Sequence, residues 1–132
     1  MTSNLLFEYQ LTDGIHHFTT LEKTGAAVKA LLEYAEGLLN TLPDDETARI
    51  LVDFRLSGVP PIAEGVVHLL AFFRRQGHKK QMQRIAYLYP RAAQSHILTG
   101  FLGIQRFLPQ GVITRFFRED EEEKARAWLQ TV

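Results

Sequence analysis

The stretch RILVDFRLSGVPP, Arg49 to Pro61, decides the fold. Its first half is a run of aliphatic and β-branched residues, which predicts a central strand buried on both faces. Its second half turns polar at Ser57 and Gly58 and then leads through two prolines into an apolar helical pattern. Proline is well tolerated in the first turn of a helix. We therefore expect a strand, a functional bend at its carboxyl end, and a helix packed on that strand.

Upstream of this stretch, the pattern predicts a β-hairpin followed by a helix. Leu5–Leu11 and Ile15–Thr19 are short apolar runs separated by an Asp-Gly pair, which is typical of a tight hairpin turn. His16 and His17 are adjacent on the second run, so they point to opposite faces and are not expected to share a metal ion. From Thr24, apolar residues recur at helical spacing at Val28, Leu31, Leu32, Ala35, Leu38, Leu39 and Leu42.

Downstream, a helix is expected with Ile62, Val66, Leu69, Leu70 and Phe73 on its buried face. Glu64, His68, Ala71 and Arg75 would lie together on its opposite, solvated face. Glu64 and His68 are four residues apart, which suits a weak surface ion pair better than a catalytic pair. Gly77 is expected to end this helix within the basic segment 74–84, which we interpret as a solvated helix end, with a phosphate-binding patch as the alternative.

The rest of the chain predicts a strand, a helix, a strand and a final helix. The strands are Ile85–Tyr89 and Val112–Phe117. The helix between them is expected from Ala92 to Ile104, and His96 on its apolar face is expected to pack into the protein core. Acidic residues 119–123 would form the first turn of the last helix, where the helix dipole favours them. Two i,i+4 ion pairs are expected there, Asp120 with Lys124 and Glu122 with Arg126.

This order of elements predicts a single-domain α/β fold. Repeated strand-helix-strand units give a mostly parallel five-stranded sheet with an N-terminal β-hairpin and four helices. A length of 132 residues suits one domain, 1–132. Fifteen basic and fifteen acidic residues balance, so no global field draws the chain to nucleic acid. The chain has no cysteine, no signal-peptide pattern, and no apolar run of the roughly 20 residues that a membrane span needs, so we expect a cytoplasmic protein.

Enzyme motifs do not explain the polar residues of the bend. The sequence has no glycine-rich nucleotide loop, no nucleophile elbow and no HExxH pair, and we expect no cofactor and no metal. A triad of Ser57, His68 and Asp53 is disfavoured, because Asp53 ends the strand instead of orienting His68. Three kinds of function are compared: binding of a protein, binding of a small molecule, and catalysis. Catalysis by a site built from Ser57, Glu64 and His68 is the weakest of the three.

The order of elements, the central ILVDFRLSG and the closing TRFFREDEEEKARAWL resemble STAS domains of anti-sigma-factor antagonists, particularly their SpoIIAA-like subgroup. The resemblance extends from about Leu5 to Leu129. It implies a non-catalytic regulatory module that binds a protein partner, such as an anti-sigma factor or a kinase-type regulator. In that family a phosphorylated serine begins the helix after the central strand. Here Ile62, Ala63, Glu64 and Gly65 match that motif, so Glu64 stands where the serine would be and the usual switch is missing.

Two further expectations locate the binding site. If the chain binds a protein, the resemblance implies that it does so through the bend and the following helix, with the residues Asp53, Arg55, Ser57, Gly58, Glu64 and His68. If it binds a small anionic or lipid-like molecule, the carboxyl edge of the sheet is the expected place. The polar residues expected at that edge are Arg55, Ser57, Tyr87, Tyr89 and Arg91. A homodimer is compatible with the pattern, although no residue specifies it.

Overall fold

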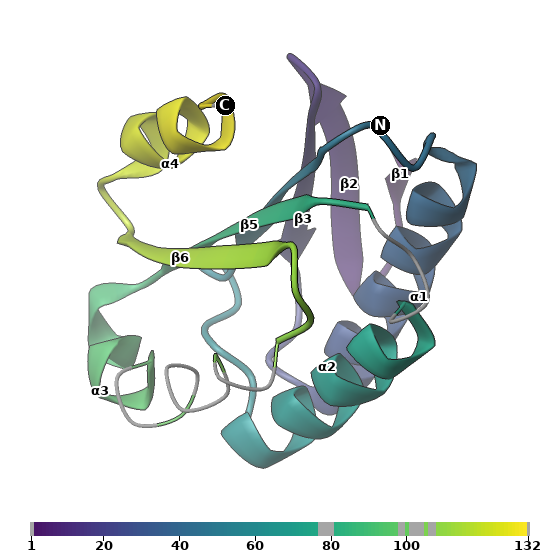
Figure 1. Ribbon diagram of the computed structural model, residues 1–132. Coiled ribbons are helices and arrows are strands. Elements are labelled where there is room, and N and C mark those ends of the chain that lie inside the picture. Colours follow the sequence, from purple (N-terminus) through teal and green to yellow (C-terminus); the bar gives the residue numbers. More distant parts are fainter. Residues whose placement is uncertain (1, 77–80, 98–99, 101–104, 106–107, 132) are drawn as a thin grey trace.

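The computed structural model describes residues 2–76, 81–97, 100, 105 and 108–131, which form one sheet with helices on both faces (Figure 1). The strands lie in the order in which they occur along the chain. They are β1 (Thr2–Ser3), β2 (Phe7–Thr12), β3 (Ile15–Thr20), β4 (Ala48–Asp53), β5 (Gln83–Tyr89) and β6 (Val112–Arg118). The helices are α1 (Gly25–Thr41), α2 (Ile62–Gln76), α3 (Gln94–His96) and α4 (Glu122–Leu129), and a 3-10 turn, η1, covers Arg91–Ala93.

The predicted mixed sheet is confirmed. Strands β2 and β3 form the antiparallel hairpin, and β3, β4, β5 and β6 are parallel neighbours. The hairpin turns at Asp13 and Gly14, both with positive φ (54° and 77°), a conformation that glycine adopts without strain. The sequence did not predict β1, which adds a two-residue antiparallel strand beside β2.

Because the strand order is sequential and strand-helix-strand crossovers are right-handed, the crossover helices must lie on one face of the sheet. Figure 1 shows α1 and α2 side by side on that face, with α4 on the other. Successive residues of a strand point to opposite faces of the sheet, so each central strand contributes side chains to two hydrophobic cores. Phe18, Val52 and Tyr87 belong to the core beneath α1 and α2, whereas Leu51 and Leu88 belong to the core beneath α4.

Helix α1 starts where the sequence predicts, and Thr24 caps it by accepting a hydrogen bond from the backbone N–H of Ala27 (3.2 Å). Helix α2 agrees with the prediction only in part, because Glu64 and Arg75 of its polar face are exposed, whereas His68 and Ala71 are half-buried beside α1. Arg75 Nε donates to Glu36 Oε2 of α1 at 2.9 Å. The helical period alone identifies a polar face but not the neighbouring helix, so this contact was not foreseen. Helix α2 ends at Gln76, and the predicted stop, Gly77, lies outside the described residues.

The predicted helix Ala92–Ile104 is described only at its start, as the 3-10 turn η1 followed by α3. The side chain of His96 and much of the remaining segment lie outside the described residues, so the packed histidine stays a prediction.

Helix α4 begins later than predicted, at Glu122, so that residues 119–121 form a turn before it. The predicted pair of Glu122 with Arg126 is confirmed at 2.8 Å. The predicted pair of Asp120 with Lys124 is wrong, because Asp120 precedes the helix. Lys124 instead approaches Glu121 at 3.6 Å. At the other end of α4, Arg49 and Arg84 donate to backbone carbonyls of the last turn, which complements the negative end of the helix dipole.

Candidate functional site

The carboxyl end of β4 divides its side chains between the two faces of the sheet. Val52 and Phe54 point into the core beneath α1 and α2. Asp53 and Arg55 point to the face covered by α4, where Arg55 contacts Glu122. The bend that the sequence singled out therefore joins an apolar region on one side to an ionic region on the other.

The ionic region is a closed ring of five side chains from β3, β4, the bend and α4, which we call the ionic ring. Its members are His17, Asp53, Arg55, Glu122 and Arg126. Arg55 holds Asp53 with two hydrogen bonds, Nε to Oδ1 at 2.9 Å and Nη2 to Oδ2 at 2.8 Å. The same Nη2 reaches Glu122 Oε1 at 2.6 Å, and Glu122 Oε2 accepts from Arg126 Nε at 2.8 Å.

His17 closes the ionic ring and its tautomer follows from its partners. Arg126 Nη2 lies 2.9 Å from Nδ1 of His17, and because an arginine can only donate, Nδ1 must accept. The proton of a neutral His17 is then on Nε2, which faces Asp53 Oδ2 at 3.3 Å. The ionic ring thus fixes β3, β4 and α4 to one another.

The ionic ring holds its carboxyl groups in the charged form. Burial by itself raises the pKa of Asp53, but hydrogen bonds from His17 and Arg55 outweigh burial and hold that pKa well below its usual range. For Glu122, burial again raises the pKa, and hydrogen bonds from Arg126 and Arg55 lower it further than burial raises it. Asp53 is only 4% exposed, so its charge depends on these partners.

The bend itself is held by hydroxyl groups. Ser57 Oγ donates to the carbonyl of Gly58 at 2.8 Å and lies 2.6 Å from Thr20 Oγ1. Gly58 has a φ of 88°, and its N–H donates to the carbonyl of Phe54 at 2.8 Å. Asp53 is hydrogen-bonded to His17, so the structure does not assemble a triad of Ser57, His68 and Asp53.

Glu64 binds the start of the neighbouring helix. Its Oε2 accepts a hydrogen bond of 2.9 Å from the N–H of Gly25, the first residue of α1. A carboxylate is favoured there because the first backbone N–H groups of a helix lack partners and the dipole is positive. A Cβ atom at Gly25 would lie 2.5 Å from Oε2 and 3.0 Å from Cβ of Glu64, so a larger residue there would displace the Glu64 side chain. No local pattern of residues predicted this contact.

His68 lies one turn further along α2 and is half-buried. It lines an open groove of about 270 Å³ between α1 and α2, together with Lys29, Glu36 and Arg75. The groove mixes positive and negative side chains, so it has no preference for a ligand of one charge. Among the described residues, no group of three or more metal-ligating side chains could hold an ion.

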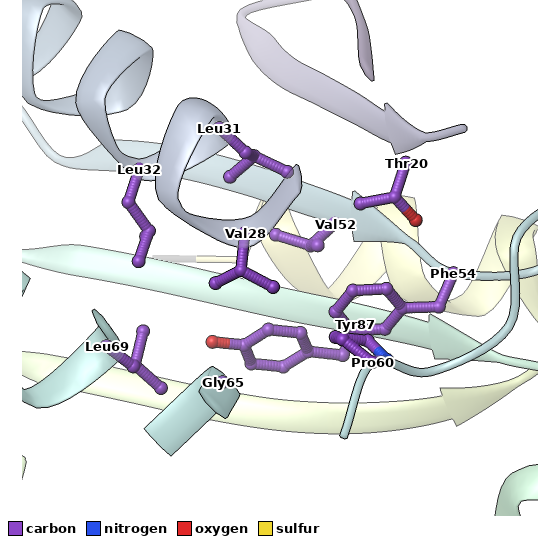
Figure 2. Close-up of a pocket in the computed structure, with 10 residues that line it drawn as sticks. All are labelled: Thr20, Val28, Leu31, Leu32, Val52, Phe54, Pro60, Gly65, Leu69 and Tyr87. Atoms are coloured by element: carbon purple, nitrogen blue, oxygen red, sulfur yellow. The ribbon is translucent and has the colours of Figure 1, made fainter. Parts of the chain in front are cut away.

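A separate, apolar cavity lies at the carboxyl ends of β3, β4 and β5. Figure 2 shows its walls, which come from the first half of α1, the first half of α2 and the sheet. Tyr87 lies across it with its hydroxyl pointing toward Leu69, and its ring stacks on Phe54 with centroids 6.0 Å apart. The cavity has a volume of about 40 Å³, so as it stands it holds no more than a few waters.

The structure separates the residues predicted to form one ligand pocket. Tyr87 lines the apolar cavity, and burial raises its pKa. Arg55 lies in the ionic ring on the opposite face, and Arg91 is exposed in the 3-10 turn. Ser57 is bound to Thr20, and Tyr89 is buried in the core beneath α1 and α2. Both arginines are thus engaged or placed away from the cavity walls, which leaves the cavity without the anion-binding groups that were expected.

Fold and bend together define a STAS-type α/β module: a sequentially ordered mixed sheet whose central parallel strand leads through a bend into a helix. Comparison with protein families agrees, because the model of the SpoIIAA-like family matches residues 16–130. The chain therefore belongs to the SpoIIAA-like family. Searches among curated proteins and among solved structures find no match. In the described part of the chain, no helix is long and apolar enough to cross a membrane.

Proposed function

We propose that this protein is a non-catalytic regulator that binds a protein partner through the bend after β4 and the exposed side of α2. Membership of the SpoIIAA-like family suggests an antagonist-like module of this kind. The observation that carries the proposal is the position of Glu64. The resemblance to the family implies that the Glu64 carboxylate replaces a switchable serine, and the N–H of Gly25 at the start of α1 binds that carboxylate. On this proposal the module lacks a phosphorylation switch at this position.

Two exposed apolar side chains mark the surface that a partner would cover. Leu56 of the bend is 71% exposed and Val67 of α2 is 64% exposed. Buried apolar contacts at the centre of an interface usually dominate its binding energy. Asp53 and Arg55 would support this surface from within the ionic ring, whereas Gly58, Glu64 and His68 would lie on it or at its border. Of the residues that the sequence suggested for partner binding, Gly58, Glu64 and His68 are therefore the ones proposed to contact or border the partner.

The experiment is a calorimetric titration against purified kinase-type anti-sigma factors from the same genome. Val67→Asp should weaken the interaction by roughly tenfold or more, because it places a charge in an apolar contact. Leu11→Asp is the matched control, since Leu11 is 57% exposed on the hairpin, away from α2. If no such factor binds the wild-type protein, or if Val67→Asp binds as well as Leu11→Asp, the proposal is wrong.

A second candidate function rests on the apolar cavity. Open α/β sheets commonly bind small molecules at the carboxyl ends of their strands, and this cavity lies there. Its lining favours a lipid-like chain over an anionic head group. Because its present volume is only about 40 Å³, α1 and α2 would have to separate to admit a ligand. Thermal shift with decanoic acid tests this: stabilisation that Val28→Trp abolishes supports the candidate, and no stabilisation rejects it.

A further inference from the structure

The face of the sheet that carries α4 also carries three arginines on three neighbouring strands. Arg49 of β4 pairs in register with Arg84 of β5, and both contact the last turn of α4. Arg115 of β6 lies over the ring of Phe117 on the same face, with its guanidinium carbon 5.1 Å from the ring centroid. Arg84 lies similarly over Trp128, at 5.7 Å.

Of the other arginines in the described part of the chain, four pair with a carboxylate, and Arg74 and Arg91 form no ion pair with a described residue. Arg55, Arg75, Arg118 and Arg126 are each paired with a carboxylate. Arg84 and Arg49 instead donate to carbonyl and hydroxyl oxygens, and Arg115 rests on an aromatic ring. No carboxylate of the described residues pairs with any of these three. Arg115 is exposed and Arg49 and Arg84 are half-buried, so these three cations gather on one face of a chain whose formal net charge is zero.

The same surface borders an edge strand. Strand β6 is the last strand of the sheet, and no further strand of the described residues pairs with it. Every second residue of β6 points to this face. Ile113 is 45% exposed, Arg115 is exposed, and Phe117 is buried under α4. Arg84 is near Ile113, its register partner. An edge strand offers both N–H and C=O groups, which an added peptide strand can satisfy.

We propose that the outer edge of β6 binds an extended acidic segment of a partner protein, which adds a strand to the sheet and places its carboxylates near Arg84 and Arg115. An apolar side chain of that segment would cover Ile113. The guanidinium groups suit carboxylates, and an edge with which no strand of the described residues pairs suits a peptide backbone. This surface is separate from the bend and α2, so it would serve a second contact.

Other occupants fit the surface less well. Nucleic acid and anionic lipid present phosphates, which accept hydrogen bonds from N–H groups but cannot satisfy the C=O groups of an edge strand. Both also prefer a broader positive field than three arginines in a neutral chain provide. A second copy paired antiparallel about Arg115 would place two Arg115 side chains opposite one another, and like charges in that position are destabilising.

The experiment is an NMR titration of the isotope-labelled full chain with the capped peptide Glu-Val-Glu-Val-Asp-Val-Glu. Amide shifts should change saturably along β6, and the affinity should fall as salt is added. Arg115→Glu should weaken binding by roughly tenfold, since it replaces an attraction by a repulsion. Arg74→Glu, an equal charge reversal at an exposed residue of α2, should bind like the wild type. The amide spectrum of each variant reports directly whether it is folded, and Arg115→Gln gives a milder second variant.

Several results would overturn the proposal. One is an acidic peptide that leaves the β6 amides unchanged, and another is equal binding of the same peptide with lysine at every acidic position. Concentration-dependent changes along β6 without peptide would assign the edge to a second copy. Tighter binding of a single-stranded oligonucleotide or of phosphatidylglycerol vesicles at β6 would assign it to phosphates.

Discussion

The two faces of the sheet hold the carboxyl end of the same central strand by different means. On the face of α1 and α2, Phe54 and Tyr87 stack beside a small apolar cavity. On the face of α4, Asp53 and Arg55 belong to the ionic ring. Apolar packing is nearly independent of pH and salt, whereas a buried carboxylate is stable only while its partners are present. The bend between them is thus fixed from both sides, which leaves its exposed residues available for a partner.

The largest loss of stability is expected from a substitution on the apolar face of the sheet. Phe54→Ala removes a ring that is 4% exposed and stacked on Tyr87, and it should lower the free energy of unfolding by about 4 kcal/mol. Urea denaturation followed by circular dichroism measures this loss. The loss should be the same at pH 5 and pH 8, because no titrating group is removed. A loss that varied strongly between these pH values would show that the two faces are coupled.

The second largest loss of stability is expected from a substitution in the ionic ring, on the face that carries α4. Asp53→Asn keeps the shape of the side chain but leaves the guanidinium of Arg55 without its buried counter-charge, and should cost about 3 kcal/mol at pH 7. The matched control is Asp120→Asn, whose carboxyl is 65% exposed and 4.0 Å from Arg118. That control should stay within about 0.5 kcal/mol of the wild type. Equal losses in the two variants would mean that the ionic ring contributes no more than a surface ion pair.

A smaller effect is expected where Glu64 binds the start of α1. Glu64→Gln keeps an acceptor oxygen but removes the charge that the helix dipole favours, so it should cost about 0.5 to 1 kcal/mol. The same denaturation experiment measures it, and Glu33→Gln in the middle of α1 is a control that lacks this helix terminus. A loss above about 2 kcal/mol would mean that Glu64 has a structural role larger than a cap.

Local sequence signals predicted the fold well. The Asp-Gly turn, the helical spacing of apolar residues from Thr24 and the strand-helix alternation are local signals, so the hairpin and the parallel strands could be predicted. The short strand β1 could not be predicted, because two residues carry no period. The start of α4 was predicted too early, since acidic residues are favoured both in a first helical turn and in the turn before it.

The candidate site was predicted less well, because its contacts join distant parts of the chain. A strand buried on both faces shows no alternation, so nothing in the sequence assigned Asp53 to α4 and Val52 to α1 and α2. Asp53 and Arg55 were expected to bind a partner, and the structure places them in the ionic ring with His17 and Arg126. Glu64 was expected to face solvent beside His68, and its contact with Gly25 depends on how two helices pack.

The most direct test of this account is the unfolding free energy of the wild type and of Asp53→Asn between pH 2.5 and pH 7. The native pKa of Asp53 lies below its unfolded value of about 4, so the unfolded chain binds the proton first as the pH falls. The stabilisation is therefore complete above about pH 4.5 and is lost progressively below it. The account predicts that the gap between the two proteins is widest at neutral pH and narrows steadily below about pH 4. A gap that stayed constant down to the lowest pH would contradict it.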